Sequence, residues 1–143
     1  MERSDLVLCV LAAGDCAVHT PVQVQKLLFL VDKRLAPALG GPHFDFQPYF
    51  YGPFDRQVYL ELEKLAQQDL VEISWTGTKK AYKLTRQGQE RGEEVLATLP
   101  EKVRQFLREL SAILRGMSFG ELVSAIYRAY PEMKENSVFQ TIE

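Results

Sequence analysis

Hydrophobic residues recur at helical spacing in five stretches of the chain, and this pattern predicts a mainly helical protein. In the stretch 4–13, apolar side chains fall at i, i+3, i+4 and i+7, the stripe of an amphipathic helix. The same spacing predicts four further helices, over about 20–36, 54–68, 100–115 and 118–130, and Thr85 is expected to cap another helix that runs to about Thr98. Ser4 is the expected N-cap of the first helix, and Pro37 is expected to end the second. Capping boxes at Thr20 and Ser118 mark the starts of the second and the last helix.

Period-two alternation replaces the helical spacing in the remaining segments. Residues 71–75 and 81–84 alternate apolar and polar side chains on either side of a polar turn, which predicts a β-hairpin. The segment 43–54 is rich in aromatic residues and also alternates, which predicts a short extended piece with one buried face. Pro48 has no N–H to donate to a neighbouring strand, so this piece is expected at an edge or as irregular structure.

The order of these elements predicts a winged helix-turn-helix with a helical extension. Three helices followed by a hairpin is the arrangement of that fold, and the run Tyr82-Lys83-Leu84-Thr85 resembles the exit from its wing. The expected class is therefore mainly α with a small β-hairpin. We expect a winged domain over 1–99, a helical pair over 100–131 and a polar tail over 132–143. The pair packs on the winged domain or forms the interface of a homodimer.

Two further runs of residues stand out, Gln25-Lys26-Leu27-Leu28-Phe29-Leu30 and Phe46-x-Pro48-Tyr49-x-Tyr51-Gly52-Pro53-Phe54. Together they resemble the Panacea antitoxin domains and a related group of uncharacterised bacterial proteins. The ending Ala129-Tyr130-Pro131 resembles the second group as well. The resemblance implies a small winged-helix-like domain that neutralises toxins or acts as a stand-alone regulator, and it implies no catalytic residue.

Charge and composition limit the functions that are open to this chain. Of its 143 residues, 17 are Lys or Arg and 19 are Asp or Glu, which gives a net charge of −2. This balance excludes a protein that coats nucleic acid by bulk electrostatics, so any DNA binding depends on a local basic patch. The apolar stretches are too short for a membrane span, and the first residues carry acids where a secretion signal needs a basic leader. We therefore expect a cytoplasmic protein.

A local basic patch lies in the predicted wing. Four cations fall within eight residues that contain no acid: Lys79, Lys80, Lys83 and Arg86. DNA-binding helix-turn-helix proteins place a recognition helix in the major groove, and a wing beside it grips the phosphate backbone. In the third helix, Arg56 and Gln57 have side chains that can make paired hydrogen bonds to bases. The leading hypothesis is a DNA-binding transcriptional regulator. The plainer alternative is a solvated surface whose lysines prevent edge-to-edge pairing.

The third helix also contains acids that oppose DNA binding. It contains two cations and four acids, and the acids are Asp55, Glu61, Glu63 and Asp69. Glu61 and Glu63 are expected on the solvated surface of the helix, where they would repel phosphate. Such a helix suits a basic or aromatic-seeking protein, and Tyr49 and Tyr51 could anchor that partner. The second hypothesis is therefore a protein-binding, antitoxin-like or adaptor module. The aromatic segment itself is expected to form a buried plug.

No pattern in the sequence indicates catalysis, a cofactor or a metal. His19 and His43 lack a recognisable Ser, Cys or Asp relay, and His43-x-Asp45 is too short to define a metal site. No glycine-rich phosphate loop is present. Gln25 and Lys26 lie between inward-facing positions of the second helix and are expected at its solvated edge.

Overall fold

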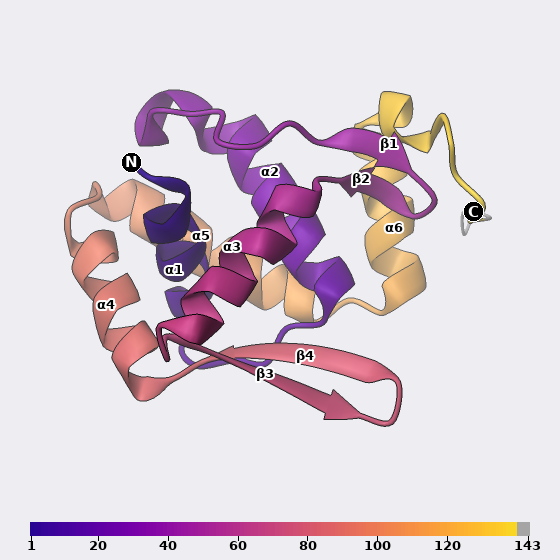
Figure 1. Cartoon of the computed structure of the whole chain (residues 1–143). Helices are drawn as coiled ribbons and strands as arrows, with labels where there is room; N and C mark the ends of the chain where they lie inside the picture. The colour runs from indigo at the N-terminus through magenta and orange to yellow at the C-terminus, as the bar shows by residue number, and fades with distance from the viewer. Residues whose placement is uncertain (140–143) are drawn as a thin grey trace.

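Six α-helices and two antiparallel hairpins make up the computed structural model, which describes residues 1–139 (Figure 1). The helices are α1 (Arg3–Ala12), α2 (Pro21–Leu39), α3 (Arg56–Gln67), α4 (Arg86–Ala97), α5 (Glu101–Arg115) and α6 (Phe119–Ala129). The strands are β1 (Gln47–Tyr49), β2 (Gly52–Phe54), β3 (Val71–Thr76) and β4 (Lys79–Leu84), and a 3-10 turn η1 (Pro131–Lys134) follows α6. The expected mainly α class with a small β component is confirmed. None of the helices within 1–139 is both long and apolar enough to cross a membrane.

Capping side chains fix the starts of the helices as expected at three places. Both capping boxes form, because Thr20 accepts from the backbone N–H of Gln23 and Ser118 from that of Glu121. Thr85 accepts a hydrogen bond from the backbone N–H of Gly88 and caps α4. These polar contacts replace helical hydrogen bonds that the first turn cannot make for itself.

Two helix limits differ from the expectation. Ser4 does not cap α1, because its hydroxyl donates to Glu61 Oε2 at 3.0 Å and the N-cap is Glu2. Pro37 does not end α2, which continues to Leu39. A proline in the last turn removes a single helical hydrogen bond, and Gly40, with φ of 72°, then supplies the left-handed residue that closes the helix.

The segment 43–54 forms a second hairpin instead of one extended piece. β1 and β2 pair antiparallel, with Tyr49 opposite Gly52 and Pro48 opposite Pro53. Gly52 has φ of 102°, a conformation that favours glycine and completes the turn. The two opposed prolines have no N–H groups to donate, which limits the ladder and keeps each strand at three residues.

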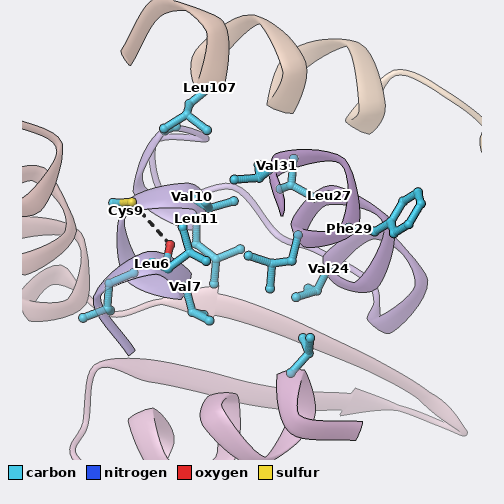
Figure 2. Close-up of a cluster of buried hydrophobic side chains, with 14 of the residues drawn as sticks. Leu6, Val7, Cys9, Val10, Leu11, Val24, Leu27, Phe29, Val31 and Leu107 are labelled. Carbon is cyan, nitrogen blue, oxygen red and sulfur yellow. Dashed lines mark hydrogen bonds between the residues drawn. The ribbon is translucent and has the colours of Figure 1, made fainter. Parts of the chain in front are cut away.

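Helix α1 lies at the centre of the core. Every residue from Leu6 to Ala12 is buried, and Figure 2 shows side chains from α1, α2 and α5 gathered in one cluster. Cys9 belongs to this cluster, and its Sγ donates to Leu6 O at 3.3 Å (Figure 2). Helix α4 approaches α1 closely at Gly92, where a Cβ atom would lie 2.5 Å from the Leu8 carbonyl oxygen. Glycine therefore permits this packing, at the cost of weaker helix propensity.

The β3–β4 hairpin gains a third backbone partner from the loop between α1 and α2. Val71 pairs with Leu84 at its base and Thr76 with Lys79 at its end. His19 bridges Tyr82 on the other side of β4, with backbone N–O distances of 2.8 and 2.9 Å. Strand β4 is thus held on both sides.

Helices α5 and α6 pack against the preceding elements. Leu107 and Leu114 of α5 are buried, and α5 contacts both α1 and α2. Helix α6 contacts β2, and the chain after η1 follows the β1–β2 hairpin (Figure 1). Along it, Val138 N donates to Phe50 O at 3.0 Å and Asn136 Nδ2 to Pro48 O at 3.2 Å. The expected polar tail therefore contacts the hairpin as far as it is described, and 140–143 lie outside the described residues.

Candidate functional site

The β3–β4 hairpin extends beyond the core and carries cations and an aromatic ring. Trp75 lies opposite Lys80, close to the turn at Gly77. The Trp75 side chain is 61% exposed although it shares a face with the core residue Tyr82. A Cβ atom at Gly77 would meet no atom within 4 Å, so the turn stands free in solvent.

The predicted cations of this hairpin differ in their surroundings. The Lys80 Nζ lies 5.4 Å from the centre of the Trp75 ring and 5.3 Å from that of Tyr82, which holds it by cation–π attraction. Lys79 and Lys83 are exposed on the opposite face of the hairpin. Lys83 is paired in register with Glu72, which partly offsets its charge.

Arg86, the fourth predicted cation, lies outside the hairpin. It begins α4, and its Nε is 3.4 Å from Glu90 Oε1. Both side chains are well exposed, so this pair is weak and Arg86 stays accessible. The structure thus groups Lys79, Lys80 and Lys83 on one strand and puts Arg86 just after it.

The outer surface of α3 is less acidic than its composition suggested. Glu61 is only 9% exposed and accepts the Ser4 hydroxyl, so its expected solvated position is wrong. Asp55 is the N-cap and accepts from the backbone N–H groups of Gln57 and Asp45. Arg56 and the Gln57 side chain remain exposed at the β2 end of α3.

Three rings of the aromatic segment are exposed, so the expected buried plug is wrong for them, although Phe44 of the same segment is buried. Tyr49, Phe50 and Tyr51 are 49%, 47% and 45% exposed. The Tyr49 ring stacks on Phe50 at 4.5 Å and on Phe54 at 5.3 Å between ring centres. The alternation of residues 43–54 predicted one continuous strand, with Phe50 on its buried face. The chain instead turns at Phe50 and Tyr51, which leaves both rings exposed.

A cavity of about 220 Å³ lies beneath these rings. We call it the aromatic pocket. It is lined by residues of α2, the β1–β2 hairpin and α3, namely Val22, Gln25, Lys26, Tyr49, Phe50, Tyr51, Gly52, Phe54 and Tyr59. Aromatic rings form most of its wall, and α2 supplies a glutamine and a lysine.

Gln25 and Lys26 are buried, so the expected solvated edge is wrong for both. They are 1% and 3% exposed. Gln25 makes two hydrogen bonds with the Asp55 backbone, from Nε2 to O at 2.9 Å and from N to Oε1 at 3.0 Å. The amide therefore fixes the start of α3 to α2. The hairpin between α2 and α3 covers this side of α2, which periodicity within α2 cannot reveal.

Lys26 is a buried cation with one hydrogen-bond partner among the described residues. Its Nζ donates to Pro53 O at 3.1 Å. The ion pairs formed within 1–139 do not include it, and an ammonium group has three N–H donors. Burial lowers the pKa of Lys26 from 10.5 to about 8.

The two histidines occupy structural positions. His19 is 1% exposed, and burial, followed by the charge of Arg115, lowers its pKa to about 4. Asp32 accepts from the backbone N–H groups of His43 and Phe44 and lies 3.5 Å from His43 Nδ1, an acid–histidine contact that sequence spacing missed. Asp32 thus anchors the loop before β1. No group of three or more His, Cys, Asp or Glu within 1–139 is placed to hold a metal ion.

A third surface feature is an apolar groove between α2, α5 and α6. Its volume is about 300 Å³, and its lining includes Leu30, Leu110 and Ile113. Ile113 is 62% exposed. This groove is the surface on which the expected homodimer would depend, and the dimer stays a prediction.

The chain matches no protein-family model and no curated protein. The resemblance to the Panacea antitoxin domains therefore stays a prediction from two runs of residues. The β3–β4 hairpin and the aromatic pocket are the surface features that bear most directly on function.

Proposed function

We propose that the protein is a cytoplasmic, non-enzymatic winged-helix regulator that binds DNA through the β3–β4 hairpin. The observation that carries this proposal is the pairing of β4 on both sides. A winged helix has a short strand between its first two helices, and the His19 bridge to Tyr82 supplies it. The order α1, His19, α2, α3, β3, β4 therefore supports a winged helix in which the β3–β4 hairpin is the wing.

The chemistry of the hairpin suits a nucleic-acid backbone. Lys79 and Lys83 present two cations from one face, and phosphate contacts of this kind supply most non-specific affinity. Trp75 adds an exposed ring that can stack on a base or sugar. Glu61 is buried and accepts a hydrogen bond from Ser4, so its carboxylate does not repel phosphate at the surface of α3.

The long connection between α2 and α3 supports a leading role for the wing in this proposal. Helix-turn-helix motifs join these helices by a turn of about 3–4 residues, whereas here the segment 40–55 contains the whole β1–β2 hairpin. Arg56 and Gln57 begin α3 directly beside this insertion (Figure 1). We therefore expect contacts from the hairpin to dominate those from α3.

Charge reversal on the hairpin tests the proposal. The double variant Lys79→Glu and Lys83→Glu should weaken binding to a labelled DNA duplex about tenfold or more at low salt. It should also reduce the slope of log affinity against log salt by about 2, one for each lost phosphate contact. Fluorescence anisotropy measures both quantities.

The matched control for this experiment is Lys102→Glu with Lys134→Glu, which changes the charge equally at two exposed lysines of α5 and η1. It should keep most of the affinity. Equal losses in the two double variants, or an unchanged salt slope in the hairpin variant, would contradict a role for the wing.

A protein-binding module is the second candidate function. The exposed rings of Tyr49, Phe50 and Tyr51 favour it, because tyrosine is enriched in interface hot spots. The acidity of α3, which was the other reason for this candidate, gives less support. Glu61 and Asp55 both accept hydrogen bonds from within the molecule. Absence of salt-dependent DNA binding by the wild-type protein would favour this candidate over the first.

A further inference from the structure

The aromatic pocket contains a buried positive charge, that of Lys26. We propose that this pocket binds a small molecule in which one carboxylate is attached to a planar apolar body, and that Lys26 pairs with the carboxylate. The proposal concerns a ligand site and is independent of the DNA-binding proposal. It rests on the position of Lys26, on the charge of the lining and on the size and rings of the cavity.

The charge of Lys26 is buried with few partners. A buried ammonium is destabilising unless it is paired and fully hydrogen-bonded, yet Lys26 is 3% exposed and bonds one carbonyl group, that of Pro53. Its terminus lies beneath the hairpin turn, since a Cβ atom at Gly52 would be 3.8 Å from Nζ. The remaining N–H donors are available to a ligand in the pocket that Lys26 lines.

The charge of the lining favours a single anionic group. Among the described residues that line the pocket, Lys26 is the only charged side chain and none is an acid. Gln25 is occupied by two hydrogen bonds to the Asp55 backbone, so it does not compete for a ligand anion. One ammonium without an arginine suits a singly charged carboxylate better than a phosphate, which proteins usually bind with several donors.

The size and the aromatic wall of the cavity suit a planar apolar group. At about 220 Å³ the cavity is smaller than the 300–1,000 Å³ typical of drug-sized ligands, so it fits a body of about one ring. The Phe54 ring meets the Tyr59 ring edge-on at 5.6 Å, and Tyr49 stacks on Phe54. Such rings offer both faces and edges to a planar apolar group.

Titration of the full chain with defined probes tests the proposal. The anionic probes are benzoate and 3-phenylpropionate, and benzamide is the neutral match for benzoate. Saturable shifts of backbone amide NMR signals are expected for at least one acid, centred on the β1–β2 hairpin, with benzamide about tenfold weaker or more. No saturation by either acid up to about 10 mM, or equal affinity for benzoate and benzamide, would overturn the proposal.

Two variants of α2 separate the buried charge from charge in general. Lys26→Met removes the ammonium and keeps a long unbranched side chain, and it should lower the affinity for the acids about tenfold or more. Lys33→Met removes an exposed lysine from the same helix and should leave the affinity unchanged. Wild-type affinity in Lys26→Met would overturn the proposal.

A pH series on the wild-type protein provides a test that needs no variant. The titratable side chains lining the pocket with Lys26 are Tyr49 and Tyr51 of the hairpin and Tyr59 of α3. Burial raises the pKa of Tyr59 to about 12, whereas Lys26 loses its proton from about pH 8. Benzoate affinity should therefore fall as the pH rises past 8, while benzamide affinity stays constant. A benzoate affinity that does not change between pH 7 and about 9.5 would overturn the pairing with Lys26.

Discussion

The β3–β4 and β1–β2 hairpins are both two-stranded and antiparallel, but different contacts maintain their shapes. Strands β3 and β4 have six residues each, and the base of their hairpin is built into the core through Val71 and Leu84. Strands β1 and β2 have three residues each and place Pro48 opposite Pro53. Side chains from elsewhere hold this second hairpin, among them Lys26 on one side and Asn136 on the other.

This difference separates two kinds of surface. A hairpin with its own backbone ladder can extend into solvent and present fixed charges, as a DNA-binding wing requires. A hairpin that depends on side chains from α2 and on the chain after η1 forms one wall of a pocket. A ligand in that pocket would add to the contacts that hold the hairpin in place.

The largest expected effect comes from breaking the base of the β3–β4 hairpin. In Gly88→Ala, the new Cβ atom would lie 1.9 Å from the carbonyl oxygen of Leu70, the residue before β3. We expect a loss of about 3 kcal/mol or more in the free energy of unfolding, because backbone must move to remove the overlap. Urea denaturation measures it.

Gly116→Ala is the matched control for this substitution. Its Cβ atom would lie 3.5 Å from the nearest backbone oxygens, an ordinary contact. The change should stay within about 1 kcal/mol. Similar losses in the two variants would show that the contact between α4 and Leu70 does not control the position of the hairpin.

The next largest expected effect is a loss of stability in acid, and it comes from His19 beside β4. The pKa of His19 is lowered from 6.5 to about 4, so the unfolded chain takes up its proton first as the pH falls. The contribution of His19 to stability is complete above pH 6.5 and declines by about 3 kcal/mol as the pH falls towards 4. His19→Gln should remove this part of the pH dependence in urea denaturation. An identical decline in the variant would contradict it.

The smallest expected effect lies beside the β1–β2 hairpin and has the opposite sign. Lys26→Met should raise the free energy of unfolding at neutral pH by about 2 kcal/mol, because the relief of a buried charge exceeds the loss of one hydrogen bond to Pro53. The folded-state pKa of about 8 lies below the ordinary 10.5, so the wild-type protein should recover this difference as the pH rises between these values. Denaturation at pH 7 and near pH 10 compares the two proteins, and a destabilised variant would contradict the prediction.

Sequence patterns predicted the parts of the fold that local periodicity controls. The six helices follow from apolar spacing and caps, and the β3–β4 hairpin follows from alternation around a turn that contains Gly77. The β1–β2 hairpin was missed because its turn contains Phe50 and Tyr51, which are not turn residues, and its glycine comes one residue later. Period-two alternation cannot distinguish one strand from two strands joined in this way.

The candidate sites were predicted less completely, for a related reason. Lys79, Lys80 and Lys83 could be grouped because they are neighbours on one strand. The burial of Lys26 depends on a hairpin that covers a second side of α2, and the burial of Glu61 depends on Ser4 of α1. Contacts between distant segments leave little signal in a single sequence.

The burial of α1 on all sides has a consequence for synthesis on the ribosome. Residues 3–12 are translated well before 86–97, yet the close contact at Gly92 shows that α1 depends on α4 for part of its cover. Until α4 emerges, the apolar surface from Leu6 to Ala12 has no complete partner inside the chain. Exposed apolar segments of this kind promote aggregation and are bound by chaperones. The nascent chain is therefore most vulnerable in the interval between the translation of its first and its fourth helix.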